Sequence, residues 1–244
     1  TAAEIALQNG SLDGWDGSSP NAATDSKFWD TSNEGAKMGG LTPTQAVTDF
    51  VHTQGGKAAK LESGKVDLMG GIFAAASLYT GSFGSTNIWT QTATVNFGQS
   101  FTARPIALKG FYKYTSNVIN LVKNVPAGVT IVKDQTLDQC AIYIALAKKT
   151  YTIDNGNQST FIDFKNDENI IAYGELPSGA ATEGDGYVEF NIPLKYKNLT
   201  DQPTHIIVVC SSSKYGDYMT GGAGSTLYVD DLSLIYDGTP TIWE

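Results

Sequence analysis

Short runs of apolar residues, separated by turn-forming clusters, cover the chain from residue 90 onward. The pieces TATVNF, YVEFNI and LYVDD place apolar side chains at every second position, which is the period of a half-buried β-strand. No segment sustains helical periodicity beyond one or two turns. We predict strands in the ranges 89–97, 104–114, 139–148, 159–164, 169–176, 186–194, 204–212 and 225–236. This pattern is typical of an all-β sandwich or barrel.

The first 88 residues follow a different pattern, because Gly, Ser, Asn, Thr and Ala dominate them. Short apolar pieces occur at 44–51 and 58–64, and we expect short strands, one helical turn and long loops. The chain shows no internal repeat, no proline-rich linker and no abrupt change of composition. We therefore predict one domain over residues 1–244, with long N-terminal loops.

Two adjacent acids, Asp230 and Asp231, interrupt the predicted strand STLYVDDLSLIY at 225–236. Successive side chains of a strand point to opposite faces, so one of the two carboxylates points to the buried face and needs a partner. Alternation puts Asp230 on the face of Leu232 and Leu234. We predict that Asp230 is satisfied by backbone amides or by a cation, and that Asp231 reaches solvent at a bend.

A third acid, Asp13, lies in the piece NGSLDGW near the start of the chain. The first and last strands of a sandwich often lie together, so Asp13 and Asp230 are candidate ligands for a structural Ca²⁺, which prefers oxygen ligands. The alternative is that Asp13 is a turn acid and that the aspartate pair bonds backbone amides or an arginine. The residues alone leave both open.

Charge and composition exclude some classes of partner. The net charge is −9, and the 16 Lys and Arg residues are scattered, which argues against binding to a nucleic-acid backbone. No apolar run approaches the roughly 20 residues that a membrane-spanning helix needs. The chain begins at Thr1 without a basic and apolar leader, so one interpretation is that a targeting segment has been removed.

The two cysteines, Cys140 and Cys210, lie inside apolar strand-like runs and lack metal-ligand spacing. They are either two buried free thiols or a disulfide between neighbouring strands.

Aromatic residues in polar surroundings are the candidates for contact with a sugar, whose C–H face packs on a flat apolar ring. Trp15 and Trp29 have such surroundings, where each is either a lid over the core or a sugar platform. Trp89, which opens a strand, and Trp243, near the end of the chain, are weaker candidates.

Tyr112 follows Gly110, which we interpret as a possible strand bulge. Tyr112 belongs to the core under strict alternation and to the surface with a bulge. Arg104 offers five donors in a rigid fork for hydroxyls or a carboxylate. Its alternative role is a salt bridge with Asp185 or Glu189. Asp185, in a Gly-rich loop, is also a candidate sugar-binding residue.

Several stretches, in this order and at these spacings, carry a resemblance to a known family: FWDTSNEG (28–35), VNFGQSFTARPIALKGFYKY (95–114), DQCAIYIAL (138–146) and IIVVCSSSKYGDYMTGGAGSTLYVDDLSL (206–234). The chain resembles the putative carbohydrate-metabolism domain of gut Bacteroidetes lipoproteins. Its two ends are similar to galactose-binding-like jelly-roll carbohydrate-binding modules, in which an early acid and a late aspartate often hold calcium. One departure is Met219, where the family pattern suggests an aromatic residue.

The resemblance implies a jelly-roll β-sandwich and export to the cell surface or periplasm of a Gram-negative bacterium. It also implies a lipid anchor upstream of Thr1 and a role with polysaccharides or oligosaccharides. Our leading hypothesis is an exported, noncatalytic carbohydrate-binding or glycan-capture domain that acts in bacterial polysaccharide utilisation.

Two alternatives remain, a structural or adhesion domain and a glycoside hydrolase that uses an Asp/Glu pair. Glu175, Glu183 and Asp185 are the candidate acids for a hydrolase, since they flank a Gly-rich loop. The sequence lacks a Gly-x-Ser-x-Gly elbow, a His-Glu-x-x-His motif and a phosphate-cradling loop, so serine, zinc and nucleotide chemistry have no support.

Overall fold

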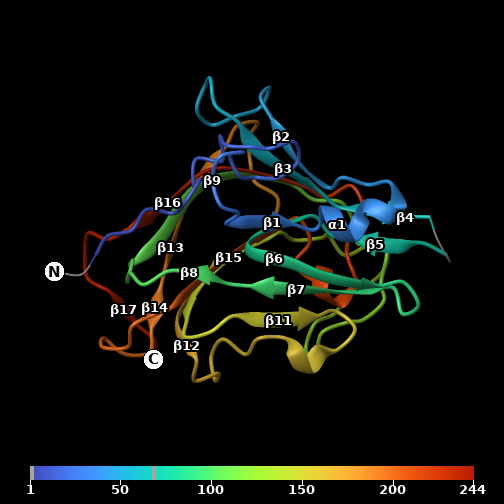
Figure 1. Ribbon diagram of the computed structural model, residues 1–244. Coiled ribbons are helices and arrows are strands. Elements are labelled where there is room, and N and C mark those ends of the chain that lie inside the picture. Colours follow the sequence, from blue (N-terminus) through green and yellow to red (C-terminus); the bar gives the residue numbers. More distant parts are fainter. Residues whose placement is uncertain (1–2, 68–69) are drawn as a thin grey trace.

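The computed structural model describes residues 3–67 and 70–244, and these form two stacked β-sheets (Figure 1). The larger sheet has the order β11 (Tyr151–Asp154), β7 (Thr92–Phe97), β6 (Ser77–Asn87), β15 (His205–Ser211), β10 (Ala141–Ala147), β12 (Ile170–Glu175), β14 (Lys195–Tyr196) and β17 (Thr241–Ile242). Strand β1 (Trp29–Thr31) pairs with β6, and β8 (Gln99–Ser100) pairs with β15. The predicted all-β jelly-roll sandwich is confirmed.

The smaller sheet has the order β13 (Val188–Pro193), β9 (Ala107–Thr115), β16 (Thr226–Ile235), β3 (Ala58–Glu62) and β2 (Thr44–Val47). A separate hairpin joins β4 (Gly64–Val66) to β5 (Ile72–Ala74). The helical pieces are short: α1 (Asn33–Ala36), η1 (Lys37–Gly39), η2 (Gln158–Thr160) and η3 (Gly216–Tyr218). The described start of the chain, from residue 3, and the C-terminus lie on the same side of the molecule (Figure 1).

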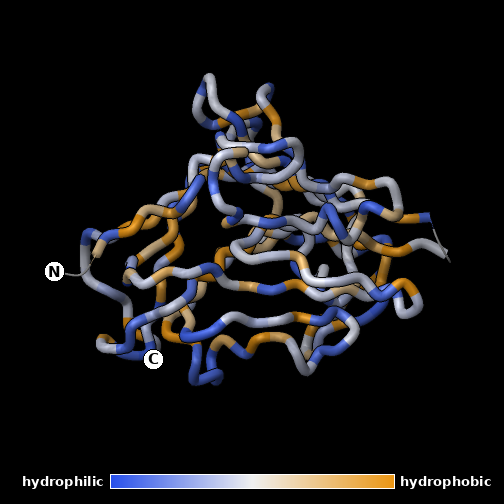
Figure 2. The backbone as a smooth tube through the Cα atoms, viewed as in Figure 1, coloured by the Kyte–Doolittle hydropathy of each residue, from blue (hydrophilic) through white to orange (hydrophobic). Residues whose placement is uncertain are grey.

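The main core lies between the two sheets, and a second apolar cluster covers the other face of the larger sheet. Strand β15 contributes to both clusters, because Ile206 and Val208 belong to the main core and Ile207 and Val209 belong to the second cluster. A strand buried on both faces is apolar at consecutive positions instead of alternating positions. Figure 2 shows such orange segments inside the sandwich. The outer face of the larger sheet is therefore itself apolar.

The strand predicted at 159–164 is wrong, because this stretch begins with η2 and continues as a loop. The Asn157 side chain accepts a hydrogen bond from the Ser159 N–H at 3.1 Å and caps the short helix. Such local side-chain bonds compete with strand pairing. The long strand β6 lies where we expected mainly loops, because its Gly, Ser and Thr residues mimic loop composition.

Cys140 and Cys210 are buried free thiols, which confirms the first of the two interpretations. Burial raises the pKa of the Cys140 thiol to about 12 and raises that of Cys210 as well. Both thiols therefore stay protonated and act as small apolar side chains.

A buried carboxylate, Asp138, holds the loop that connects β15 to β16. Its Oδ2 accepts from Ser213 Oγ at 2.6 Å, Gly222 N at 2.8 Å and Ser225 Oγ at 3.0 Å. Its Oδ1 accepts from Gln139 N at 2.9 Å. Burial raises the pKa of Asp138, while these donors act against the rise. One side chain thus fixes both ends of the loop that carries η3.

The acids Asp13, Asp230 and Asp231 hold another loop, residues 52–57. Asp230 Oδ2 accepts from His52 N at 2.8 Å, and Asp13 Oδ1 accepts from Lys57 N at 2.8 Å. Asp230 Oδ1 also accepts from Asp231 N at 2.8 Å. The backbone-amide version of our prediction for Asp230 is confirmed.

The assignment of faces around Asp230 is corrected by a bulge. Strand β16 shifts its register against β9 between Asp230 and Ser233, and Asp231 has a φ of 50°. The extra residue turns Leu232 into the core, while Asp230 faces the loop on the opposite side. Gly110 lies opposite this bulge, where a Cβ atom would be 2.6 Å from the Leu232 side chain.

We expect Asp138→Ala to lower the free energy of unfolding by about 3 kcal/mol, because four donors lose their common acceptor in a buried site. Urea denaturation measures this loss. Asp185→Ala, which removes an exposed carboxylate, is the matched control and should change stability by under about 0.5 kcal/mol. An Asp138→Ala variant as stable as the control would contradict the role of this carboxylate.

Asp230 should make the stability depend on pH. Burial, followed by the charge of Asp231, raises the pKa of Asp230 from 3.8 to about 6. A raised pKa stabilises the fold below the unfolded value, and this stabilisation is lost as the pH rises through about 6. Asp230→Asn removes this titration. From pH 4 to pH 7 the free energy of unfolding of the variant should therefore rise, relative to that of the wild type, by on the order of 2 kcal/mol. Thermal melts of both proteins at pH 4 and pH 7 measure the difference in stability between them. A difference that is the same at both pH values would contradict the role of Asp230.

The calcium hypothesis for Asp13 and Asp230 stays a prediction. A cation bound only to the folded protein raises the melting temperature, and its removal lowers it. Thermal melts in calcium and in EDTA test this directly. Equal melting temperatures would contradict a calcium site and leave the backbone amides as the partners of both acids.

Candidate functional site

The outer face of the larger sheet is the face that points away from the smaller sheet. Its second apolar cluster is built from β6, β7, β10, β11, β12 and β15. Tyr79, Tyr143 and Val209 occupy one register row across three of these strands. The other sheet does not cover this face, so loops and ligands are its possible neighbours.

A cavity of about 350 Å³ opens on this face. Its base is formed by β6, β7, β10 and β15, and its walls come from α1, η1, the β4–β5 hairpin and η3. The volume falls in the usual range for a site that takes a small molecule or one unit of a larger one. Most of the lining residues are apolar, including Phe73, Phe83, Val95 and Met219.

A second, smaller hollow of about 110 Å³ adjoins the first. Tyr143, Lys214 and Asp217 line both hollows. Phe161 and Tyr218 line only the second one, where their rings meet edge to face with centroids 5.1 Å apart. The two hollows therefore form one continuous surface, with Tyr143 and Asp217 at their junction.

Aromatic rings continue this surface along the sheet, and we call them the aromatic strip: Tyr143, Phe164, Tyr173 and Trp243. Phe164 stacks on Tyr173 with centroids 4.3 Å apart, and Tyr173 stacks on Trp243 at 5.9 Å. Tyr143 meets Phe164 at 5.4 Å. All four residues are half-buried, so part of each reaches solvent.

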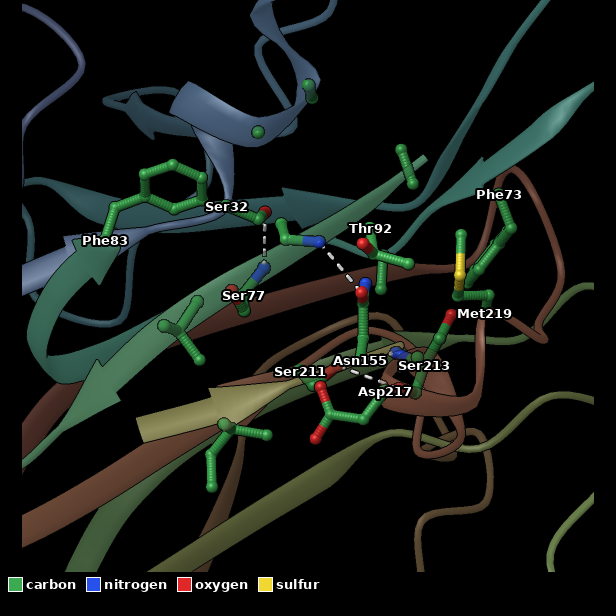
Figure 3. A pocket seen from close by; sticks show the side chains of 18 of the residues that line it. Ser32, Phe73, Ser77, Phe83, Thr92, Asn155, Ser211, Ser213, Asp217 and Met219 are labelled. Carbon is green, nitrogen blue, oxygen red and sulfur yellow. Dashed lines mark hydrogen bonds between the residues drawn. The ribbon is translucent and has the colours of Figure 1, made fainter. Parts of the chain in front are cut away.

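Two polar side chains stand out in the cavity, Asn155 and Asp217 (Figure 3). Asn155 Oδ1 accepts from Ala93 N at 2.9 Å, which fixes the orientation of the amide. Asp217 comes from η3, and the surrounding protein raises the pKa of its carboxyl. Within the described residues, neither the Asp217 carboxylate nor Asn155 Nδ2 has a hydrogen-bond partner. Both are free to contact a ligand.

The Tyr79 hydroxyl lies in the wall of the cavity and is buried without a hydrogen-bond partner in the described part of the chain. Burial, followed by the charge of Asp30, raises its pKa. The phenol therefore stays neutral, and its ring serves as an apolar part of the wall.

The structure places the predicted tryptophans away from this surface. Trp29 is fully buried in the main core, and its Nε1 donates to Gln8 O at 2.8 Å. Its prediction as a sugar platform is wrong, because no face of the ring reaches solvent. Trp15 is half-buried against the same core, and its Nε1 donates to Leu12 O at 2.7 Å.

Arg104 is occupied by the protein itself. Its guanidinium donates to Asn198 O at 3.0 Å and to Asp201 O, and it lies 4.4 Å from the centre of the Tyr196 ring. The alternative salt bridge with Asp185 or Glu189 is not formed either, since Arg104 is held by main-chain oxygens. Arg104 therefore connects its own segment to the loop 198–201 by hydrogen bonds.

Tyr112 packs against the main core and meets Phe190 edge to face with centroids 5.7 Å apart, in agreement with the core alternative. Asp185 is exposed in the loop between β12 and β13. Of the predicted sugar-binding residues Trp15, Trp29, Arg104, Tyr112 and Asp185, none is among the described residues that line the cavity. The structure does not bring them together.

Sequence reasoning missed Tyr143, Asn155 and Asp217. A signal was present for Tyr143, because a consecutive apolar run such as AIYIALA indicates a strand with two buried faces. Asn155 and Asp217 lie in turns, and only the fold brings these turns to one cavity. Trp243, considered a weaker candidate, belongs to the aromatic strip.

The chain matches the model of a known family. The family model described as "Putative carbohydrate metabolism domain" matches residues 9–235. No curated protein matches the chain.

Two solved structures are similar, and both are described as putative glycoside hydrolases. The one from Bacteroides thetaiotaomicron is 25% identical with a TM-score of 0.64, over 86% of this chain and 63% of that chain. The chain thus spans less than two thirds of that relative. The one from Bacteroides vulgatus is also 25% identical with a TM-score of 0.64, over 88% of each chain.

A more distant match is a carbohydrate-binding module solved with β-1,4-galactotriose. It is 10% identical with a TM-score of 0.34, over 86% of this chain and 88% of that chain. This likeness is too weak to carry an argument. The family model, in contrast, covers nearly the whole chain. The protein is a carbohydrate-related β-sandwich that belongs to the Putative carbohydrate metabolism domain family.

Proposed function

We propose that the protein binds oligosaccharides or polysaccharides on the outer face of the larger sheet, without cleaving them. The aromatic strip beside the two hollows is the observation that carries this proposal. Its rings hold one another in place by stacking, since Phe164 lies at 21° to Tyr173 and Tyr173 lies at 25° to Trp243. Rigid, half-exposed aromatic rings pack well on the C–H faces of sugars.

The polar groups beside the strip suit the hydroxyls of a sugar. Asp217 offers acceptor oxygens and Lys214 offers donors, and both line the junction of the two hollows. A sugar ring on Tyr143 would have its edge within reach of these groups. Apolar faces combined with a few polar groups are typical of sites that fix the orientation of a ligand.

Binding is favoured over hydrolysis by the number of acids at the site. The two Bacteroides relatives are described as putative glycoside hydrolases, and such enzymes usually use two carboxyl groups on either side of the bond. Among the residues that the structure describes, Asp217 is the one carboxylate that lines the cavity. Glu175 lies at the strip, where it accepts from the Tyr173 hydroxyl at 3.1 Å. Glu183 and Asp185 lie in a separate exposed loop.

We propose in addition that the protein is exported and acts at the envelope of a Gram-negative bacterium during polysaccharide utilisation, anchored by a lipid upstream of Thr1. The support is the family membership together with relatives from Bacteroides species. In the described part of the chain, no helix has the length and apolar character to span a membrane.

Tyr143→Ala and Phe164→Ala should each weaken glycan binding about tenfold, because each removes a ring worth about 1.4 kcal/mol of contact. Affinity electrophoresis against a panel of polysaccharides finds a ligand, and isothermal titration with its oligosaccharides gives the dissociation constants. Tyr228→Ala is the matched control, since Tyr228 is a half-buried ring on the smaller sheet.

Three outcomes separate the alternatives. Binding that is weakened by the strip variants and not by Tyr228→Ala supports the proposal. Release of reducing ends from a bound glycan would show hydrolysis and overturn the noncatalytic role. A protein that retains no glycan in the panel, or that binds equally well without Tyr143 and Phe164, would overturn the proposed site.

A further inference from the structure

We infer that the cavity takes an N-acetylated sugar, with the acetamido group between Asn155 and Asp217 and its methyl group against the apolar wall. This inference rests on the proposed function and names the class of ligand for the same face of the sheet. Three features of the cavity carry it: a fixed donor, a free acceptor and an apolar lining.

Asn155 supplies the fixed donor. Its Oδ1 accepts from Ala93 N, and its own N–H donates to Ala93 O at 3.2 Å, so two bonds to one residue hold it at the end of β11. A flipped amide would set two donors against each other at Ala93. Nδ2 is therefore the amide atom left for a ligand, and it can donate to the carbonyl oxygen of an acetamido group.

Asp217 supplies the acceptor from a different wall of the cavity. It lies in η3, whose C-cap residue Met219 has a φ of 60° and whose loop is held by Asp138. Within the described residues no hydrogen bond or ion pair satisfies the Asp217 carboxylate. The N–H of an acetamido group is a donor that suits it. A trans amide presents its N–H and C=O on opposite edges, so partners on two separate walls match it.

The rest of the cavity favours a methyl group over a hydroxyl. In Figure 3, Phe73 and Met219 lie on one side of the Asn155 and Asp217 side chains, and Phe83 lies on the other. A sugar hydroxyl buried against these side chains would lose its hydrogen bonds to water without replacement. An acetyl methyl group would instead bury apolar surface there. The part of the cavity next to these three side chains thus favours an acetyl methyl group over a hydroxyl.

A free amino sugar lacks two groups that the cavity would contact, the carbonyl oxygen for Asn155 Nδ2 and the methyl group for the apolar wall. Its ammonium group would lie between charges of opposite sign, because Lys214 and Asp217 line the same two hollows. Glucosamine is therefore an informative comparison, because it keeps the sugar ring and lacks only the acetyl group.

Isothermal titration with N-acetylglucosamine, N-acetylgalactosamine, glucosamine, glucose and galactose tests the inference. We expect at least one N-acetylated sugar to bind about tenfold or more tightly than its parent hexose and than glucosamine. Asn155→Asp keeps the acceptor for Ala93 N and removes the donor, so it should reduce this preference about tenfold. Asp185→Asn, at an exposed acid away from the cavity, is the matched control.

Ala141→Leu is a second variant, which adds bulk to the base of the cavity from β10. It should reduce binding of the N-acetylated sugar, and thermal melts of both variants check that they fold. Equal affinity for N-acetylated and plain sugars, or a preference that survives in both variants, overturns the inference and leaves the proposed function standing. No binding of any of these sugars, with no glycan retained in the wider panel, overturns both.

Discussion

The buried carboxylate of Asp138 is the interaction on which the architecture of the site depends. Its two oxygens accept from two backbone amides and two serine hydroxyls, and three of these donors, Ser213, Gly222 and Ser225, come from both ends of the loop between β15 and β16. A buried carboxylate is stable only when such donors surround it. The requirement works in both directions, because the loop must keep its shape for the carboxylate to be satisfied. Asp217 reaches the cavity on this loop.

The second constraint is that the central strands of the larger sheet are apolar on both faces. One face is covered by the smaller sheet, which leaves Tyr79, Tyr143 and Val209 on the other. Loops surround this outer face without filling it, and a cavity of about 350 Å³ remains. The site is therefore a consequence of how the sandwich is assembled: the same strands that complete the core also present an apolar base to a ligand.

The aspartate pair in β16 lies in the smaller sheet, away from the cavity. Asp230 accepts backbone amides of the loop 52–57, and Asp231 Oδ2 accepts from the Thr53 hydroxyl at 2.6 Å and lies 2.7 Å from His52 Nδ1. The bulge at these residues lets two neighbouring acids serve one loop while Leu232 returns to the core. These acids thus hold the loop 52–57 by hydrogen bonds. They lie in the smaller sheet, whereas the aromatic strip lies on the larger sheet.

The sequence by itself determined the fold class, most strand positions and the family, since each depends on local periodicity or on motifs spread over the chain. It also identified Asp230 as an acid that requires a partner. Only the tertiary structure decided the site. Trp29 and Arg104 have suitable chemistry, yet the fold uses one in the core and the other as a tie between loops. Asn155 and Asp217 are ordinary turn residues in the sequence, and they become a site because strand order brings β11 and η3 to the same face. Local pattern specifies which side of a strand is apolar, whereas contacts between distant segments decide which apolar face stays open.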